Sequence, residues 1–370
     1  MSAEAFNRDV QAFKERLRTM IARAELSEGV RIDEPLLRHE TGVTVRAARL
    51  ALSELAREGL IVRKPHVGTF VSGRLPGAAF AVLPKLRSVG ILSSRSQSYF
   101  AATIFGATVM RGVEASLHAP MHISFFVHSE ARPMSLDDLP LTETDTIKRS
   151  CQGLLAIEAN HASRLNELAG NGVAVVAIDF SAPGAAFDAV EVDHFSAGYQ
   201  TTRHLIALGH RRIAFAGEAA MPESTDPTWQ SRLSGYLRAM LEAGLDVSQH
   251  TILDMGRSDR RLPAALPPFH RRYSPTAYVL CGGGQAPITA RVLAELGLNV
   301  PGDVSLAAAD SSLPELNGAP LSQARVDYEL LGRTAIRLLA SRLACKAMPP
   351  LHVTLPVGFF PGATTRTYGT

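Results

Sequence analysis

Residues 43–61 read VTVRAARLALSELAREGLI and contain an amphipathic helix. Its apolar positions recur at the spacing of one helical face, which carries Ala48, Ala51, Leu52 and Leu55. The opposite face carries the polar positions Arg46, Arg49, Ser53 and Arg57. Because Thr44 can cap the helix at its start and Gly59 can end it, we expect a helix that runs to about residue 58.

Two further helices and a ribbon surround this segment. Apolar residues recur at helical spacing over residues 10–23, a second helix fits residues 34–40, and Gly42 supplies a tight turn. Residues 60–62 and 69–71 are typical of two short strands, and PHVG at residues 65–68 is typical of the turn between them. Three helices followed by a two-stranded ribbon predict a winged helix-turn-helix domain over residues 1–73.

The basic face of the third helix suits the major groove of double-stranded DNA. An arginine there can donate two hydrogen bonds to guanine O6 and N7, a pair worth roughly 1–3 kcal/mol of base discrimination. A stripe of charges is more often a solvated face, but the ribbon after the helices favours DNA binding. Residues 1–74 hold 13 Lys+Arg and 10 Asp+Glu, so the whole net charge of +3 lies there. We therefore expect any polyanion contact in this segment.

These segments resemble the GntR family of bacterial regulators. ELSEGVRID is similar to that family's link between its first two helices, VTVRAARLALSELAREGLI matches its recognition helix without gaps, and GTFV is its wing signature. The resemblance implies DNA contacts by Thr44, Arg46, Arg49 and Thr69. Val45 stands where the family commonly has arginine, and His66-Val67 replaces its usual Gly-Arg or Gly-Lys at the wing tip. We therefore do not expect the wing to insert into the minor groove, and we expect His66 or Lys64 to contact phosphate instead.

Strand and helix patterns alternate after a Gly-, Pro- and Ala-containing linker over residues 74–86. The expected strands are Ser88–Leu92, Met121–Val127, Gly153–Ala156, Ala174–Ile178, Ala189–Val192, Ile213–Ala216, Ala277–Leu280 and Ser305–Ala309. Apolar strands that alternate with helices predict parallel sheets covered on both faces. Because residues 87–370 are too many for one sheet, we expect an α/β fold of two Rossmann-like lobes.

This larger segment resembles the LacI/GalR regulators and the type I periplasmic-binding-protein-like fold. The matching stretches are VEVDHFSAGYQTTRHLIALGHRRIAFAG, SRLSGYLRAMLEAGLDV, LNVPGDVSLAAAD and APLSQARVDYELLGRTAIRLL. A GntR-type winged helix joined to this sensor is similar to an arabinose-repressor-like subgroup. We expect lobe 1 at about residues 87–188 and 310–324, and lobe 2 at about residues 189–309 and 325–360.

Polar residues that follow the apolar strands mark the expected effector site, because ligands in such folds bind at the carboxyl ends of strands. They are Ser94, Asp179, Gly283, Gln285 and Asp310. The resemblance adds Arg232, which matches a ligand-contacting arginine, and Phe100, which matches an aromatic residue that lines the first lobe. Arg232 can alternatively form a surface ion pair, and Asp310 can alternatively stabilise the crossover between the lobes.

Glycine residues replace an expected ligand group at residues 282–284. Aligned without gaps, the Asn-Asp pair of the resembled family falls on Gly282-Gly283, and in the sugar-binding members that aspartate accepts hydrogen bonds from ligand hydroxyls. Glycine cannot do so. The backbone N–H groups of this turn can instead hold an anionic group of the effector. The alternative is a loop that has lost ligand contact.

Composition and the remaining motifs limit the function. No stretch approaches the roughly 18–20 apolar residues of a membrane span, and the first residues carry charges where a secretion signal is apolar. Cys151, Cys281 and Cys345 lie far apart without metal-binding or disulfide spacing, so we expect reduced, mostly buried thiols. G-x-S-x-G, Walker A and paired catalytic carboxylates are absent from the sequence. We therefore expect neither a metal nor a cofactor, and no enzyme activity.

The sequence predicts a cytoplasmic, homodimeric transcription regulator, and we expect it to be a repressor. Its partners would be double-stranded operator DNA and a small-molecule effector, a sugar or sugar derivative including anionic ones, with no membrane partner. Two alternatives come from other classes. A solute-binding protein of a transport system would share the two lobes but lack the winged helix. A Rossmann-type enzyme would use the turn at residues 282–284 for a nucleotide, although that turn lacks G-x-G-x-x-G spacing.

Overall fold

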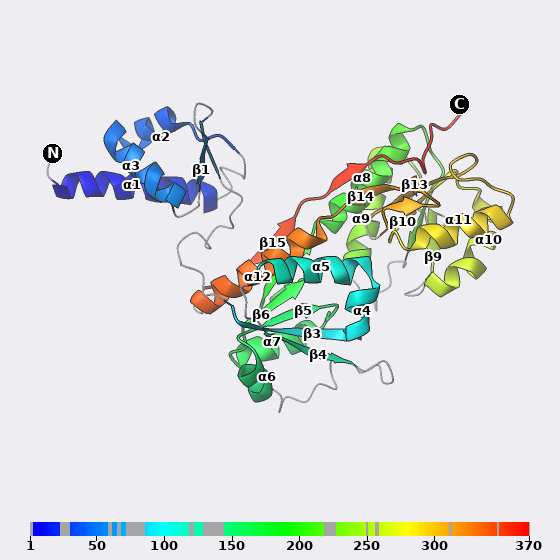
Figure 1. Cartoon of the computed structure of the whole chain (residues 1–370). Coiled ribbons are helices and arrows are strands. Elements are labelled where there is room, and N and C mark those ends of the chain that lie inside the picture. The colour runs from blue at the N-terminus through cyan, green and yellow to red at the C-terminus, as the bar shows by residue number, and fades with distance from the viewer. Residues whose placement is uncertain are drawn as a thin grey trace. The chain divides into compact units, whose positions relative to one another are not determined.

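The chain divides into two units in the computed structural model (Figure 1). One unit comprises residues 1–84 and 340–346, and the other comprises residues 85–339 and 347–370. The structure describes residues 3–22, 30–57, 61–64, 68–71, 86–117, 122–128, 144–217, 227–248, 251–255, 259–310, 313–345 and 348–369. The predicted linker over residues 74–86 lies outside the described residues, apart from Leu86.

The described residues between 3 and 71 of the first unit form three helices and an antiparallel ribbon. The helices are α1 (Ala3–Ala22), α2 (Glu34–Thr41) and α3 (Val45–Arg57), and the ribbon joins β1 (Ile61–Lys64) to β2 (Gly68–Val71). Helix α2 ends at Gly42, whose φ of +66° places it in the left-handed region that glycine tolerates. Helix α3 is capped by the preceding residue, Thr44, whose Oγ1 accepts a hydrogen bond from the N–H of Ala47 at 3.3 Å. The winged helix-turn-helix order is therefore confirmed.

The core of this unit is formed by the apolar faces of its helices. The predicted inward face of α3 is fully buried and packs with Phe13 and Leu17 of α1. Ile61 and Val71 add the buried face of the ribbon. The segment before α2 also pairs with β2, since Ile32 N–H donates to Thr69 O at 2.8 Å and Val71 N–H donates to Val30 O at 3.0 Å. This pairing was not predicted.

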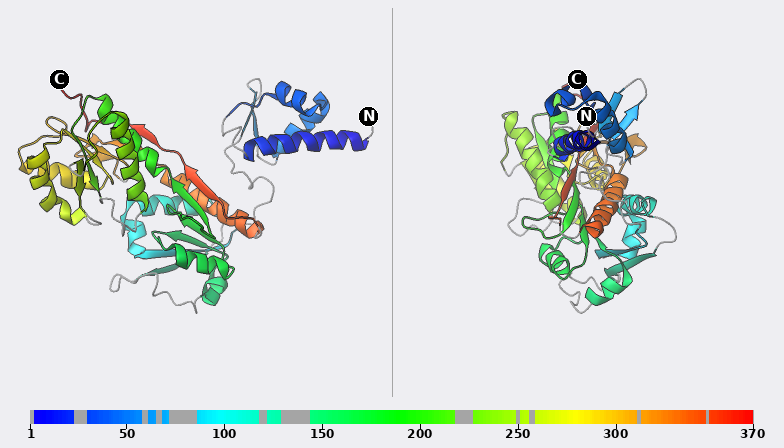
Figure 2. Two further views of the ribbon diagram at one scale, coloured as in Figure 1. Left: turned by 180° about the vertical axis from the view of Figure 1, so that it is seen from behind. Right: turned by 90° about the vertical axis from the view of Figure 1, so that its left-hand side faces the viewer.

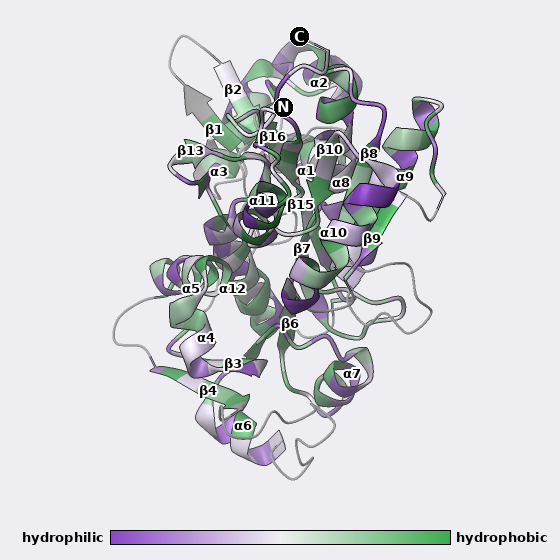
Figure 3. Ribbon diagram, turned by 90° about the vertical axis from the view of Figure 1, so that its right-hand side faces the viewer, coloured by the Kyte–Doolittle hydropathy of each residue, from purple (hydrophilic) through white to green (hydrophobic). Residues whose placement is uncertain are grey.

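The second unit contains two six-stranded sheets, one in each lobe. The lobe 1 sheet has the order β15-β7-β6-β5-β3-β4, and all its neighbouring strands are parallel. Its strands are β3 (Ser88–Ser96), β4 (His122–His128), β5 (Leu154–Ile157), β6 (Val175–Ile178), β7 (Asp188–Val192) and β15 (His352–Leu355). Every residue of β5 and β6 is buried, and β6 has the hydrophobic colour in Figure 3.

The lobe 2 sheet has the order β16-β14-β11-β10-β8-β9. Its strands are β8 (Ile213–Gly217), β9 (Ile252–Asp254), β10 (Ala277–Leu280), β11 (Ser305–Ala308), β14 (Ser322–Arg325) and β16 (Gly358–Phe360). All pairs are parallel except β14 with β16. A small hairpin of β12 (Glu315–Leu316) and β13 (Ala319–Pro320) lies between β11 and β14 in the chain. All eight predicted strands are thus observed, and the two-lobed α/β fold is confirmed.

Helices separate many of the strands along the chain. They are α4 (Gln97–Ala102), α5 (Ile104–Ala115), α6 (Thr144–Ser150), α7 (Ala162–Gly170), α8 (His194–Ala207), α9 (Pro227–Glu242), α10 (Leu262–Tyr273), α11 (Gln285–Glu295) and α12 (Tyr328–Ala344), with a short 3₁₀ turn at Asp259–Arg261. Close contacts show which helices pair. A Cβ on Gly332 of α12 would overlap the carbonyl oxygen of Val109 in α5, and one on Gly198 of α8 would overlap that of Arg232 in α9. Among the described helices, none is long and apolar enough to span a bilayer.

The structure corrects the predicted boundaries of the lobes. Residues 310–324 were expected in lobe 1, but β14 pairs with β11 in the lobe 2 sheet. Residues 325–360 were expected in lobe 2, but α12 packs on α5 and β15 pairs with β7 in lobe 1. The chain therefore crosses between the lobes after β7, after β14 and after β15, and its orange-to-red C-terminal part reaches both sheets (Figure 2). The sequences of β14 (SQAR) and β15 (HVTL) are short and combine polar with apolar residues. Such sequences do not indicate which sheet a strand joins.

Candidate functional site

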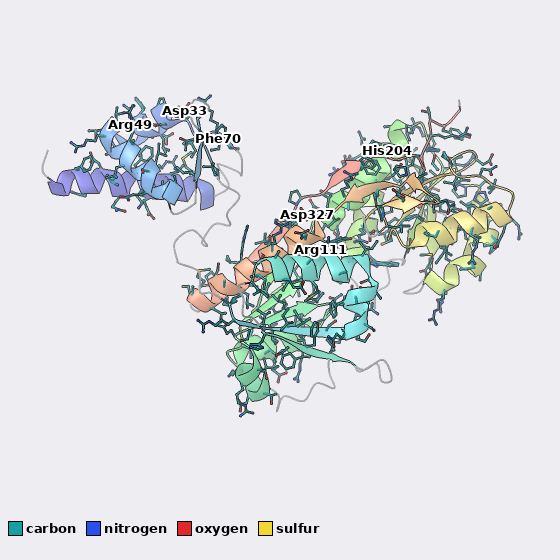
Figure 4. The ribbon with its side chains drawn as sticks, viewed as in Figure 1. Asp33, Arg49, Phe70, Arg111, His204 and Asp327 are labelled. Carbon is teal, nitrogen blue, oxygen red and sulfur yellow. The ribbon has the colours of Figure 1, made fainter. Side chains whose placement is uncertain are left out.

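Helix α3 presents a continuous exposed face in the first unit. The exposed residues are Thr44, Val45, Arg46, Arg49, Leu50 and Ser53. They follow the helical repeat opposite the buried face, as the sequence pattern predicted. Arg49 lies at the surface of this unit, as Figure 4 shows. The guanidinium carbon of Arg46 lies 5.4 Å from the ring centre of Phe6 in α1, within the range of a cation–π contact.

Two other basic side chains of the unit are paired with carboxylates, unlike those on this face. Lys14 is bound to Glu54 at 2.7 Å, and Arg16 is bound to Glu40 at 3.0 Å. Arg46 and Arg49, in contrast, form no ion pair with any described residue. Their positive charge is therefore not neutralised within the described part of the unit, and it can attract a polyanion.

The remaining predicted DNA contacts lie in the ribbon. Thr69 is half-buried in β2, and its carbonyl oxygen is occupied by the N–H of Ile32 at 2.8 Å. Its side chain is thus the part left for a phosphate contact. The Lys64 side chain and all of His66 lie outside the described residues.

The second unit contains a buried hydrogen-bond network around Arg232. This side chain comes from α9 and is only 5% exposed. Its Nε donates to His194 Nδ1 at 3.2 Å, and its Nη1 donates to the carbonyl oxygen of Cys281 at 2.6 Å and to Asp310 Oδ2 at 3.3 Å. Arg232 thereby joins the start of α8 to the segments that follow β10 and β11. Because Arg232 is buried, it does not form the surface ion pair that was the alternative.

Asp179 extends the network into lobe 1. It follows β6 with a φ of +60°, an uncommon conformation for a residue other than glycine. Its Oδ1 accepts hydrogen bonds from His194 Nε2 at 2.8 Å and from the N–H of Val192 at 3.3 Å. His194 therefore lies between Asp179 of lobe 1 and Arg232 of lobe 2. A single row of polar groups connects the two lobes.

Electrostatic interactions favour the charged forms of Asp179 and Arg232, the two ends of this row. Burial by itself would raise the pKa of Asp179, but His194, Arg232 and the hydrogen bonds to this carboxylate outweigh burial and lower the pKa. Burial by itself would lower the pKa of Arg232, but Asp310, with smaller contributions from groups such as Asp179, raises it. We conclude that a carboxylate and a guanidinium are both kept ionised beneath the protein surface.

The glycine turn after β10 is part of the same network. The N–H of Gly283 donates to Asp310 Oδ1 at 2.8 Å, and the N–H of Gly282 lies 3.5 Å from Gln285 Oε1. The sequence predicts that an anionic group of the effector binds at this turn. In the structure the protein's own carboxylate, Asp310, occupies that position at Gly283.

Ser94 of β3 and Phe100 of α4 belong to a different cluster in lobe 1. The hydroxyl of Ser94 donates to the carbonyl oxygen of Glu158 after β5. The ring of Phe100 is buried and lies 5.6 Å from the ring of Tyr99 and 6.0 Å from that of Phe125. Among the described residues, no hydrogen bond or ring contact connects either side chain to the Arg232 network. The structure thus brings together four of the predicted effector residues, Asp179, Arg232, Gly283 and Asp310, with Gln285 beside the glycine turn.

A cavity of about 120 Å³ lies beside the network, between elements of both lobes. Its lining consists of Asp179, Phe180, Glu191, Val192, Asp193, His194, Pro227, Thr228, Ser231 and Thr354. Three carboxylates, one imidazole and three hydroxyl groups are among these side chains, and no lysine or arginine is. The lining can accept hydrogen bonds from hydroxyl or ammonium groups, whereas an anion would be repelled.

His194 is the functional candidate that the sequence analysis missed. Asp193 and His194 directly follow the predicted strand at residues 189–192, and polar residues at the carboxyl end of a strand face the ligand in such folds. That rule would have selected Asp193 and His194. Thr228 and Ser231 precede Arg232 on α9 and follow no strand directly in the described chain, so the rule could not select them.

Comparisons with known proteins give the family of each domain. Residues 10–71 match the model of the bacterial regulatory proteins of the gntR family, and residues 202–365 match the model of the periplasmic binding protein-like domain. The HTH-type transcriptional repressor MelR of Bacillus subtilis (strain 168) is 27% identical over 217 residues, which are 57% of this chain and 62% of MelR. The chain therefore matches about three fifths of the length of that relative.

Two further similarities cover more of the chain. The HTH-type transcriptional repressor PurR of Yersinia pestis bv. Antiqua (strain Antiqua) is 28% identical over 275 residues, which are 71% of this chain and 75% of PurR. The solved structure of the transcriptional regulator CelR–cellobiose complex has a TM-score of 0.62 at 20% identity, covering 88% of this chain and 94% of that chain. The latter similarity supports the fold.

These comparisons confirm both resemblances found in the sequence. The relatives are named as regulators and repressors, in agreement with the expectation that the chain is not an enzyme. The gntR match coincides with the unit that carries α3, and the second match covers α9 and the segments after β10 and β11. The chain therefore contains a gntR-type helix-turn-helix domain at residues 10–71 and a periplasmic binding protein-like domain matched over residues 202–365.

Proposed function

We propose that the protein is a bacterial transcription repressor that binds operator DNA and is controlled by a small-molecule effector. The observation that carries the proposal is the exposed face of α3, where Arg46 and Arg49 form no ion pair with any described residue in a domain of the gntR family. The named functions of MelR and PurR support repression. Thr44, Thr69, Lys64 and His66 are proposed to add phosphate contacts.

The test measures binding of the full chain to duplex DNA selected from a random pool. Replacing both arginines (Arg46→Ala with Arg49→Ala) removes two base or phosphate contacts and should weaken binding at least tenfold, while reducing the salt dependence. A control with Arg203→Ala and Arg238→Ala removes the same charge from exposed positions of α8 and α9. It should bind as the wild type does. Selection of no preferred sequence by the wild type would contradict the proposal.

We further propose that the effector binds between the lobes and is a neutral compound rich in hydroxyl groups, such as a sugar. The cavity beside Asp179 and His194 offers carboxylate and hydroxyl acceptors, and none of the described residues that line it is a lysine or arginine. The relative CelR is described as a cellobiose complex, which favours this class. Because the cavity is smaller than the ~300 Å³ at which ligand sites usually begin, the lobes must separate to admit the effector.

Calorimetry with neutral saccharides, sugar acids and sugar phosphates tests the effector class. We expect binding of a neutral saccharide, and we expect Asp179→Asn to weaken it because the carboxylate is the stronger acceptor. Tight binding of a sugar phosphate alone would contradict the neutral class and would restore the anionic effector of the sequence prediction. The glycine turn would then have to release Asp310.

We also propose that the protein is a homodimer. A protein with two-fold symmetry presents two copies of α3 to the two half-sites of a palindromic operator. Light scattering of the free protein and of its operator complex tests this. We expect the mass of two chains in both, and a palindrome in the selected DNA.

A further inference from the structure

The exposed face of α3 contains apolar side chains next to its arginines. Val45 is 41% exposed and Leu50 is 37% exposed, although other apolar residues of this helix, including Ala48, Leu52 and Leu55, are fully buried. Val45 is the first residue of the helix and follows the Thr44 cap directly. The side chain that begins the exposed face is therefore apolar and β-branched.

Val45 lies beside an arginine on the surface of the helix. Residues four positions apart are neighbours on a helical face, so Val45 lies next to Arg49 and Arg46 lies next to Leu50. Arg49 is exposed and forms no ion pair with a described residue, which leaves its guanidinium available to a base edge. One turn of α3 thus offers a bidentate donor and an apolar surface side by side.

The major groove has one apolar group that such a surface can contact. Guanine, adenine and cytosine present hydrogen-bond donors and acceptors there, whereas thymine also presents its C5-methyl group. Residues at the N-terminus of a recognition helix are those that reach base edges. A valine at this position cannot donate or accept a hydrogen bond, so contact with a methyl group is its favourable interaction in the groove.

We propose that Val45 is a specificity-determining residue that packs against the C5-methyl group of a thymine, adjacent to a base read by Arg49. The proposal rests on the proposed DNA-binding function and adds the identity of a base that α3 reads. Leu50 belongs to the second turn of the helix and is not required for this contact. The operator half-site should therefore contain a thymine beside the base bound by Arg49.

The experiment replaces each thymine of the selected duplex, one at a time, by deoxyuridine. This exchange removes the methyl group and leaves the hydrogen-bonding groups of the base pair unchanged. At one thymine in each half-site, wild-type binding should weaken about fourfold, the factor that corresponds to ~0.8 kcal/mol for one buried methyl-sized group. In Val45→Ala the same exchange should change the affinity less than twofold, because the partner of the methyl group is gone.

Val30→Ala is the matched control. Val30 is 40% exposed in the same unit but lies outside α3, so this variant should keep the fourfold dependence on the methyl group. The proposal is overturned if no thymine shows the effect with the wild type, if Val45→Ala keeps it, or if the selected half-site lacks thymine. Failure of the wild type to select any sequence would instead refute the DNA-binding function itself.

Discussion

Arg232 is hydrogen-bonded to groups from three other segments of the second unit, and its loss should therefore affect more than one ion pair. His194, Cys281 and Asp310 all accept hydrogen bonds from its guanidinium, which is planar and offers donors in fixed directions. A lysine has a single ammonium group and cannot reach three acceptors on separate elements. The geometry thus requires arginine, and positive charge alone does not suffice.

Replacing Arg232 by methionine should lower the free energy of unfolding of the second unit by about 3–5 kcal/mol, because the buried carboxylate of Asp310 loses the guanidinium with which it forms an ion pair. Arg232→Lys should recover less than half of this loss. Adding Asp310→Asn to the methionine variant should restore part of the stability, since the uncompensated charge is removed. Urea unfolding followed by circular dichroism measures all three. Equal stability of the lysine variant and the wild type would contradict this account.

His210 predicts a dependence of stability on pH. Its ring is buried and contacts the hydroxyls of Thr276 and Ser305 and the carbonyl oxygen of Arg366. Burial lowers the pKa of His210, against a smaller opposing effect of the hydrogen bond to Arg366. The unfolded chain therefore binds the proton at higher pH than the folded protein. Stability is complete above the ordinary histidine pKa of about 6.5 and decreases as the pH falls through the lowered pKa.

Thermal unfolding between pH 8 and pH 5 tests this dependence. The wild type should lose stability below pH 6.5, and His210→Gln, which is less stable at neutral pH, should show a flatter pH dependence. His39→Gln removes an exposed histidine of α2 and should follow the wild type. Parallel curves for the wild type and His210→Gln would show that another group causes the pH dependence.

The residues of the candidate site were predictable to different degrees. Asp179 and Asp310 directly follow apolar strands, and Arg232 belongs to a sequence motif, so the sequence was sufficient to select them. That they lie in one network depends on the order of strands in space, which the sequence does not contain. The occupation of the Gly283 N–H by Asp310 could not be predicted for the same reason: β10 and β11 are neighbours only in the folded sheet.

At the scale of elements, the pair α8 and α9 depends on two glycines. A Cβ on Gly198 would overlap the carbonyl oxygen of Arg232, and a Cβ on Gly235 would overlap that of Phe195. The helices therefore approach each other closely enough for backbone contact. Since α8 begins with His194 and α9 carries Arg232, this approach also sets the distance between two members of the network.

Gly235→Ala should force the two helices apart and cost about 1–3 kcal/mol of stability, the usual cost of overpacking. It should also weaken effector binding, because Arg232 and His194 move relative to each other. Gly284→Ala is the matched control for stability, since Gly284 has a φ of −60° and no atom within 4 Å of an added Cβ. That variant should be as stable as the wild type or slightly more stable. A fully stable Gly235→Ala protein would refute the close packing.

The strands were predicted better at the centre of each sheet than at its edges. Continuous apolar runs such as residues 175–178 and 277–280 identify buried parallel strands without further information. The strands β9, β15 and β16 are short and only partly buried, so their sequences lack that signal. The lobe boundaries after residue 309 were predicted wrongly because β14 and β15 determine them.

On the scale of the whole chain, the proposed mechanism couples lobe movement to operator affinity. The row from Asp179 through His194 to Arg232 joins both lobes, so a ligand that displaces one partner changes the balance between open and closed arrangements. The coupling between two sites in one protein is typically about 1–3 kcal/mol, which corresponds to roughly 5- to 150-fold in affinity.

Operator binding with and without saturating effector tests the coupling. We expect the wild-type affinity to decrease at least fivefold with the saccharide identified by calorimetry, as repression released by ligand requires. His194→Gln should bind the operator with the wild-type affinity in the absence of ligand and should respond less, because the connection between the lobes is weakened. An unchanged response of His194→Gln would show that the coupling uses another route.

The three crossings between the lobes also determine when each lobe can be completed during translation. Lobe 1 lacks its edge strand β15 until residues 352–355 have left the ribosome, and lobe 2 lacks β16 until residues 358–360 have done so. Both sheets therefore remain incomplete until almost the whole chain has been synthesised. Until then, one edge of β7 and one edge of β14 have no neighbouring strand. The buried core of the winged helix lies within residues 10–71, so this domain can fold long before, and a nascent chain presents the proposed DNA-binding domain ahead of the domain that is proposed to control it.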